Sequence, residues 1–421
     1  MRHKPQVTSL NIYDGMSPTV GLNTDIIWLV LQQAAYTDDV WDHRTLRECC
    51  RVSHEWYPLA KRMLFRFVVL RNRRQIRALQ QTRGKHLQNR RSASPRGLGH
   101  DVPVPVDIWE AQTRILECHW CHDFRFNDIR RALALFPFLY EVRISVHIYE
   151  RFEPNRDDTW LAIPSTIRAL RYTGILGLGS LNIACASHII SVLSKHSQLR
   201  CLQFKGVSIV PHFQSPLLFQ SVQVNALLYL ELEISDLPQT LPGDLFANLL
   251  YLVLHQRSRY SHWATLKHGV FKRVKSLTAL YYARMVSPES VLRLSRLSET
   301  FPALTELRLA IRLPRVQFST IAPLLSQIPS GLISLSLFIS SNMFTATEPA
   351  ETGSKDSITI PASLRYFEYG LRYYPRIHTV VDSPVLRPFL ESCKSKEVQL
   401  LPSPIYDVAE IVSSPIVSEK Y

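Results

Sequence analysis

The residues with the most recognisable chemical spacing are the cysteines and histidines of the segment CHWCH, from Cys118 to His122. A C-x-x-C-H segment is typical of covalent haem attachment, and its two cysteines make up half of a tetrahedral zinc site. The sequence offers neither a second C-x-x-C nor a paired set of histidines to complete a zinc site. We therefore predict that these cysteines are buried strand residues and that the chain holds no metal or cofactor.

The glycine-containing and nucleophile-containing patterns of common enzymes are also missing. The run GILGLGS, at residues 174–180, has neither of the glycine spacings that are typical of phosphate-binding loops. The sequence contains no G-x-S-x-G and no H-E-x-x-H segment. We predict that the chain is not an enzyme and has no catalytic residues.

Positive charge is concentrated in one segment of the chain. Residues 61–100 contain twelve Lys and Arg residues and no Asp or Glu, and the whole chain has a formal net charge of +14. Three interpretations are open: a solvated face, a patch for nuclear import or an acidic partner, and a nucleic-acid-binding surface. No aromatic platform or nucleic-acid-reading motif accompanies the charge, so the pattern favours the first two.

The composition is that of an ordinary globular protein. Of the 421 residues, 46% are hydrophobic and 20% are charged, and the seven cysteines are thinly spread. An odd, dispersed set of cysteines favours a reducing compartment over a disulfide framework. No stretch approaches the roughly 18 apolar residues of a membrane-spanning helix, and the N-terminus lacks the apolar core of an export signal. We expect a cytoplasmic or nuclear protein, or one found in both, with no membrane partner.

An internal repeat defines the elements that must position any binding residues. The phrase L-x-x-L-x-L, with a weaker copy at Thr113, recurs at intervals of 22 to 32 residues from Leu139, Ile167, Leu199, Leu227, Leu249, Leu277, Leu304, Leu332 and Leu364. The mean interval of about 28 residues is typical of leucine-rich repeats. The phrase alternates as a short strand does, and the intervening segments have a helical period. The predicted fold class is therefore α/β: a leucine-rich-repeat solenoid with a curved parallel sheet over residues 111–401.

The first hundred residues have a different pattern. Residues 22–67 predict three helices, at Thr24–Ala35, Thr45–Ser53 and Glu55–Arg66. Residues 68–110 predict an opening strand, a basic helix from about residue 73 to 82, and an exposed linker. The ends of the chain, 1–21 and 402–421, are predicted to be flexible tails. The helical block is too small to bury a good core alone, so we expect its apolar faces to meet a partner or the solenoid.

The helical block resembles the F-box, a three-helix motif that usually opens with L-P-x-E-I and contains a later V-C-x-x-W. Its motif positions are filled by Leu22, Asp25, Ile26, Val30, Leu31, Leu46, Val52 and Trp56. Asn23 and Ser53 stand where the motif usually has Pro and Cys. An F-box followed by leucine-rich repeats is similar to the substrate receptors of SCF-type ubiquitin ligases, particularly divergent fungal members.

This resemblance implies two partners and no chemistry in the chain itself. The F-box would dock on a Skp-type adaptor carried by a cullin scaffold, and the repeats would hold a protein substrate. The implied adaptor-binding residues are Leu22, Ile26, Ile27, Val30, Leu31, Leu46, Val52 and Trp56. The alternative is that the helical block only caps the solenoid, and that the chain is a repeat scaffold without a ubiquitin ligase.

Substrate contacts are predicted on the concave face of the sheet, at positions flanking the central leucines of each strand. Arginine and tyrosine are common in binding hot spots, and seven candidates occupy these positions: Arg143, Arg171, Tyr229, Tyr251, Tyr281, Arg308 and Tyr366. We expect Tyr229, Tyr251 and Tyr281 to stack along three successive strands. The alternative is that tyrosine is simply a common strand residue.

Overall fold

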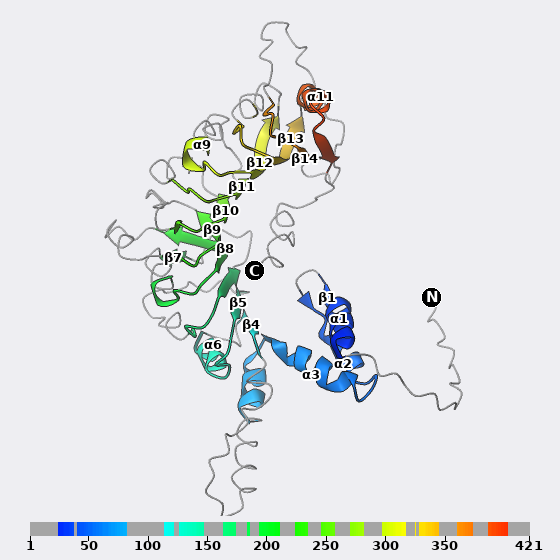
Figure 1. Ribbon diagram of the computed structural model, residues 1–421. Helices are drawn as coiled ribbons and strands as arrows, with labels where there is room; N and C mark the ends of the chain where they lie inside the picture. Colours follow the sequence, from blue (N-terminus) through cyan, green and yellow to red (C-terminus); the bar gives the residue numbers. More distant parts are fainter. Residues whose placement is uncertain are drawn as a thin grey trace, which may run out of the picture. The chain divides into compact units, whose positions relative to one another are not determined.

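The chain divides into two compact units, Met1–Leu64 and Phe65–Tyr421. The computed structural model describes residues 24–37, 40–81, 113–121, 126–146, 163–173, 183–185, 193–210, 224–234, 246–256, 270–281, 297–316, 325, 328–344, 360–373 and 386–402. The predicted N-terminal tail, the linker beyond residue 81 and all of the predicted C-terminal tail except Pro402 lie outside these residues. Figure 1 shows the elements in chain order.

The first unit is helical, as its sequence predicts. Its elements are α1 (Thr24–Ala35), the two-stranded antiparallel pair β1 (Tyr36–Thr37) and β2 (Val40–Trp41), α2 (His43–Cys49) and α3 (Trp56–Arg66), whose last two residues belong to the second unit. The bounds of α1 are those predicted, whereas the predicted start of the second helix at Thr45 is wrong. Asp42 is the reason, because its carboxylate accepts hydrogen bonds from the Arg44 backbone N–H and the Thr45 hydroxyl, at 2.9 and 2.5 Å. This N-cap lets the helix begin at His43.

The second unit is built on one parallel sheet. Its thirteen described strands are β3 (Phe67–Leu70), β4 (Ile115–Trp120), β5 (Glu141–Val146), β6 (Ala169–Thr173), β7 (Ile183–Cys185), β8 (Cys201–Val210), β9 (Tyr229–Ile234), β10 (Tyr251–Gln256), β11 (Ser276–Tyr281), β12 (Glu306–Val316), β13 (Ser334–Phe344), β14 (Tyr366–Tyr373) and β15 (Gln399–Pro402). Neighbours in the sheet follow chain order, except that β6 pairs directly with β8 and β7 lies off this path (Figure 1). Consecutive parallel strands are the arrangement of a solenoid.

Leucine at the second and fourth strand positions forms the core. Leu116, Leu230 and Leu335 belong to one continuous cluster of buried side chains that runs along the sheet. Helices α6 (Phe126–Leu133), α9 (Leu297–Thr300) and α11 (Arg387–Ser395) contribute to the same cluster. Each repeat therefore buries its leucines against its neighbours and against the segments that connect the strands.

A recurring backbone contact fixes how the strands align. At the start of nine successive strands, two consecutive N–H groups donate to one carbonyl oxygen at the start of the preceding strand, at 2.7 to 3.1 Å. For example, Leu250 and Tyr251 both donate to the carbonyl of Leu228, whose own N–H donates with that of Tyr229 to Arg200. This contact places the first residues of neighbouring strands opposite one another.

Of the strands for which a repeat phrase was predicted, all but one have the predicted register. The phrase predicted to begin at Leu277 is three residues too late, because Ser276 lies opposite Tyr251 and Leu277 lies opposite Leu252. Val274 is the true first residue of this phrase: it is fully buried and its N–H donates to the carbonyl of Phe271. The first leucines of other repeats make the same turn, as Leu304 does with Phe301. Because valine replaces leucine at this position, the phrase was not recognised there, and the register of β11 was predicted three residues too late.

The sheet extends beyond the repeated phrases at both ends. The predicted opening strand is β3, and Phe67 pairs with Ile115 of β4. The basic segment after it is helical over residues 73–81. At the other end, β15 pairs with β14, and Phe389 of α11 packs edge-on against Phe367, with the ring centres 4.8 Å apart.

No helix in the part of the chain that the structure describes is long and apolar enough to cross a membrane.

Leu252 tests how much each repeat leucine contributes to the core. Because this side chain is fully buried, Leu252→Ala is expected to lower the free energy of unfolding by about 3 kcal/mol. The half-buried neighbour Leu250 is the control, and its change to Ala is expected to cost less than about 1.5 kcal/mol. Urea unfolding of the full chain measures both. Equal losses would contradict the assignment of Leu252 to the core.

Candidate functional site

Helix α1 carries apolar side chains on two of its sides. Ile27 and Leu31 are buried, as is Leu46 of α2. Ile26, Leu29 and Val30 are 48%, 62% and 43% exposed. Their i, i+3, i+4 spacing places these three on one stripe, which we call the α1 stripe. The predicted adaptor residues therefore divide into a buried set that packs the unit and an exposed set on its surface.

The remaining predicted adaptor residues lie at the start of α3 or outside the described chain. Val52 is exposed and Trp56 is half-buried. Ser53, which stands where the F-box usually has cysteine, accepts a hydrogen bond on its hydroxyl from the Trp56 N–H at 3.3 Å. Its carbonyl also accepts the Tyr57 N–H at 3.1 Å, so Ser53 caps α3. Leu22 lies outside the described residues.

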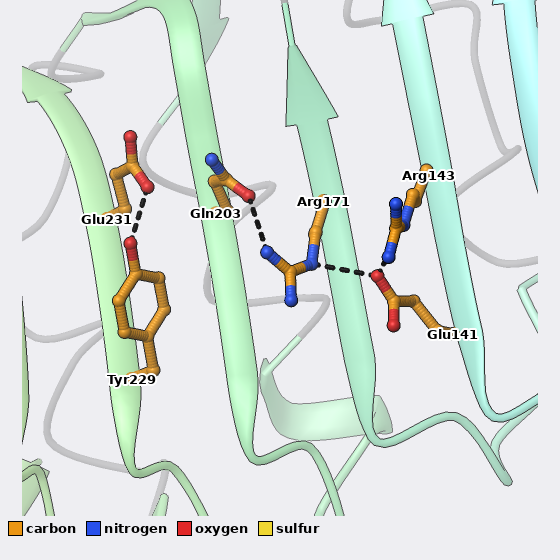
Figure 2. Close-up of polar contacts among 6 residues, drawn as sticks. All are labelled: Glu141, Arg143, Arg171, Gln203, Tyr229 and Glu231. Atoms are coloured by element: carbon orange, nitrogen blue, oxygen red, sulfur yellow. Dashed lines mark hydrogen bonds and ion pairs between the residues drawn. The ribbon is translucent and has the colours of Figure 1, made fainter. Parts of the chain in front are cut away.

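The side chains at the first, third and fifth positions of the strands point away from the leucine core. We call the surface they form the polar face. Figure 2 shows six of its side chains, from β5, β6, β8 and β9. Four lie in one row across neighbouring strands, at the third positions: Arg143, Arg171, Gln203 and Glu231. Glu141 and Tyr229 are at the first positions of β5 and β9. A small separate cluster of buried Ala169, Cys201, Tyr229 and Val253 lies on the same face.

Two arginines of this row share one carboxylate. The Nε atoms of Arg143 and Arg171 lie 2.7 and 2.8 Å from the same oxygen, Oε1 of Glu141 (Figure 2). Arg171 also donates to the amide oxygen of Gln203 on β8 at 3.5 Å. The guanidinium of Arg143 lies 5.5 Å from the centre of the Phe67 ring, which supports it from β3.

A buried acid, phenol and imidazole form a second polar group on β9 and β10. The Tyr229 hydroxyl donates to Glu231 at 2.6 Å, and Nε2 of His255 lies 2.6 Å from the other Glu231 oxygen. Glu231 and His255 have no exposed side-chain surface. Burial alone would raise the pKa of Glu231. The pKa nevertheless lies below its ordinary value, because His255 stabilises the ionised form through its hydrogen bond and its charge. The Tyr229 hydroxyl and the charge of Lys205 act in the same direction. Burial and this carboxylate hold the pKa of Tyr229 well above its ordinary value.

Two smaller polar pairs lie further along the face. On β4, Nε2 of His119 lies 2.6 Å from a Glu117 oxygen. Burial opposes ionisation of Glu117, but its bond to His119 and the charges of His119, Arg143 and Arg71 leave its pKa lowered. At the other end, the Ser336 hydroxyl donates to Glu368 at 2.9 Å. The face is therefore polar from β4 to β14.

Most of the predicted substrate residues lie on the polar face, in unequal environments. Arg143 and Arg171 are the shared-carboxylate pair, and Tyr251 and Arg308 are half-buried at the first and third positions of β10 and β12. Tyr366 is 45% exposed at the first position of β14. Tyr229 is buried, with its hydroxyl bonded to Glu231.

The predicted stacking of Tyr281 with Tyr229 and Tyr251 is wrong. Tyr281 lies at the sixth position of β11, opposite Gln256 and Ile311. The residue that lies between Tyr251 and Glu306 is Ser276, so the tyrosine row ends at β10.

The CHWCH segment does not bring its ligand types together. Cys118 is buried in the leucine core, and burial raises the pKa of its thiol far above the ordinary value. His119, the next residue, points to the polar face and contacts Glu117. Cys121 donates to the Arg71 carbonyl, at 3.4 Å, and His122 lies outside the described residues. Among the residues described, no group of three or more His, Cys, Asp or Glu side chains is placed to hold a metal ion.

Several residues of these sites were not among the predicted contacts, and Leu29, Glu231 and His255 are three of them. Leu29 completes the α1 stripe, and its signal was its spacing of three residues from Ile26. Glu231 and His255 carry the buried group, and alternation continued past the repeat phrase would have placed His255 on the same face as Val253. Their contact with each other depends on strand pairing.

The sequence was also compared with known proteins. No protein-family model matches the chain, and no curated protein matches it.

The buried Glu231 gives a pH-dependent stability test. The pKa of Glu231 in the folded chain lies below the unfolded value of about 4.5. Ionised Glu231 therefore stabilises the fold above that pH, and this stabilisation is lost as the pH falls through the folded pKa. At pH 7, Glu231→Gln is expected to cost about 3 kcal/mol, since it breaks a buried pair. The difference from wild type should shrink below pH 4.5. Thermal unfolding from pH 7 to 3.5 measures it, with exposed Glu299→Gln as control. A pH-independent difference would contradict the assignment.

Cysteine reactivity tests the placement of the strand cysteines. Burial raises the pKa of the Cys201 and Cys393 thiols to about 12 and that of Cys118 still further. We expect these three to react with iodoacetamide at pH 8 at least about tenfold more slowly than half-buried Cys49 and Cys121. Mass spectrometry of the alkylated peptides gives the rates. Fast labelling of Cys118 in the folded chain would contradict its burial.

Proposed function

We propose that this chain is a substrate receptor of an SCF-type ubiquitin ligase. Its helical unit docks on a Skp-type adaptor, and its repeat sheet holds a protein substrate. The observation that carries the proposal is the α1 stripe: a contiguous set of exposed apolar side chains on a compact unit that precedes a parallel-strand repeat sheet.

The division of apolar residues on α1 supports docking over a purely internal role. Ile27 and Leu31 already supply the side of the helix that packs its own unit. Ile26, Leu29 and Val30 are not needed for that contact, and leaving three large apolar side chains in water is unfavourable. Contiguous exposed apolar surface marks interaction sites in soluble proteins.

The repeat unit supports the second half of the proposal. A solenoid presents one continuous strand-lined surface, which is a common way of binding another protein. The polar face carries arginines and the exposed Tyr366, which are favoured hot-spot residue types. The chain's role is then to join a substrate to the ligase, and the transfer chemistry belongs to the partners.

Adaptor binding tests the proposal. The full wild-type chain is expected to co-purify with a Skp-type adaptor, and Ile26→Glu/Val30→Glu is expected to weaken binding at least about 30-fold. Each side chain buried in such an interface contributes about 1.5 kcal/mol or more. Both residues are exposed, so the variant should stay folded by circular dichroism.

The matched control is Gln80→Glu/Gln81→Glu, which adds the same charge at exposed positions of the second unit. It should bind the adaptor within about twofold of wild type. Isothermal titration calorimetry measures all three proteins. If the folded wild type does not bind the adaptor, the helical unit is a cap and the chain is a repeat scaffold without a ligase.

A further inference from the structure

The residues that immediately precede the strands form a row along one edge of the sheet. Each is joined to the next by a main-chain hydrogen bond of 2.7 to 3.0 Å. We call this set the edge row. Its members before β3 to β6 and β8 to β14 are, in order, Arg66, Arg114, Tyr140, Arg168, Arg200, Leu228, Leu250, Lys275, Thr305, Ile333 and Arg365. The row contains six cations and no carboxylate, so the aligned backbone collects positive charge on this edge.

The charge is densest where the row begins. Four of its first five members are exposed arginines, and Arg168 and Arg200 are direct neighbours whose like charges repel each other. Within the residues that the structure describes, no carboxylate forms an ion pair with Arg114, Arg168 or Arg200. An anion that binds to this part of the edge would therefore relieve the repulsion.

Two aromatic rings lie among these arginines. The guanidinium of Arg114 lies 5.9 Å from the centre of the Phe138 ring, and its Nη1 donates to the Phe138 carbonyl at 3.1 Å. The guanidinium of Arg168 lies 5.6 Å from the centre of the Tyr140 ring. Both arginines are thus held in place before any ligand arrives, which lowers the entropic cost of binding. The Phe138 ring is still 49% exposed and can stack on a flat ligand.

We propose that the edge row before β3 to β8, together with Phe138, binds a single-stranded nucleic acid. The arginines contact its phosphates, because the planar guanidinium fork pairs with phosphate oxygens, and Phe138 stacks on a base. Only Arg66 of the row belongs to the basic segment 61–100, so the interpretation of that segment is a separate matter. The inference goes beyond the proposed ligase function and does not depend on it.

The single sign of the charge favours a nucleic acid over an acidic protein segment. The six residues before each of β5, β6 and β8 to β14 include no acidic residue and seven cations: Arg168, Lys195, Arg200, Lys272, Arg273, Lys275 and Arg365. A nucleic acid is anionic along its whole length, so it can continue along this edge. It also supplies flat bases for an exposed ring, which Asp and Glu side chains do not.

The length of the arginine-rich part suits a short single strand. The five strands β3, β4, β5, β6 and β8 span about 19 Å at about 4.8 Å between neighbours. A stacked strand advances about 3.4 Å per nucleotide, so about six nucleotides cover this distance. The bases of a duplex are stacked inside it and cannot reach Phe138, whereas those of a single strand can.

Fluorescence anisotropy with the full chain, without adaptor, tests the proposal. The probes are labelled oligo(dT) and oligo(U) of about 12 nucleotides, a DNA duplex of the same length, and a peptide of alternating Glu and Ser. We expect one or both single strands to bind more tightly than the duplex and the peptide. The stronger of the two single strands distinguishes DNA from RNA. Their affinity should fall steeply as the NaCl concentration rises.

Two kinds of variant separate the phosphate contacts from the stacking. Arg168→Glu/Arg200→Glu is expected to weaken single-strand binding at least about tenfold, and to lower the slope of log affinity against log salt by about 1.4, because two phosphate contacts are lost. Phe138→Ala is expected to weaken binding at least about fivefold and to leave that slope unchanged, because it removes only stacking.

The matched control is Arg74→Glu/Arg77→Glu, which makes the same charge change at exposed positions of the helical segment 73–81. It should bind within about threefold of wild type, because salt screens exposed charges outside the site. Thermal unfolding shows which variants are folded. If Arg168→Glu/Arg200→Glu does not fold, Arg200→Gln takes its place and is expected to weaken binding about threefold.

Three results would overturn the proposal. The first is no binding of either single strand by wild type. The second is unchanged binding by Phe138→Ala together with the folded arginine variant. The third is binding of the duplex or the Glu peptide as tight as that of the single strands, and a tightly bound Glu peptide would identify an acidic protein as the ligand. Because no adaptor is present, each of these results leaves adaptor docking untouched, and loss of docking by Ile26→Glu/Val30→Glu leaves nucleic-acid binding intact.

Discussion

The backbone carbonyl that accepts two N–H groups at the start of nine of the strands is the contact on which the repeat unit depends. The main chain links one repeat to the next, from Arg114 to Ile333, and side chains such as those of Asn248 and Ser363 add hydrogen bonds to carbonyl oxygens of the preceding repeat. A main-chain contact does not depend on residue type, so the connecting segments are free to vary in length. The repeat interval can range from 22 to 32 residues while the strands remain aligned.

Alignment of the strands has a consequence for charge as well as for the core. When first residues lie opposite one another, every position forms a column across the sheet, so leucines meet leucines and third-position arginines become neighbours. Repulsion between Arg143 and Arg171 would be unfavourable without the carboxylate of Glu141. Burial of the Glu231 carboxylate would cost still more free energy without its contacts to His255 and Tyr229. The backbone alignment therefore brings charged residues together on neighbouring strands, and ion pairs and hydrogen bonds between these strands make that arrangement favourable.

The sequence was sufficient to predict most of the strands, although not β7 and β15, because alternate apolar residues, most often leucine, indicate a buried strand face. It failed where another residue did the same physical task. Val274 fills the site of the first leucine, and a pattern defined by leucine shifted the predicted register of that strand by three residues and put Tyr281 in the row of Tyr251, whereas its partner on that strand is Gln256. Asp42 caps α2 before the apolar pattern begins, so periodicity placed the helix start too late. The contacts of Glu231 with His255 and of Glu141 with Arg171 join residues 24 and 30 positions apart, and no local pattern reveals such pairs.

The two candidate surfaces use different forces, and this bears on how one chain binds two partners. The α1 stripe is uncharged, so its attraction comes from removal of apolar surface from water and is little affected by salt. The polar face carries ion-paired and hydrogen-bonded side chains, and dissolved ions screen any attraction between these charges and a partner. A partner suited to one surface gains little from the other, because a charged segment finds no charge on the stripe and an apolar helix finds charged groups on the face. Specificity for each partner then follows from the chemistry of each surface and requires no communication between the two units.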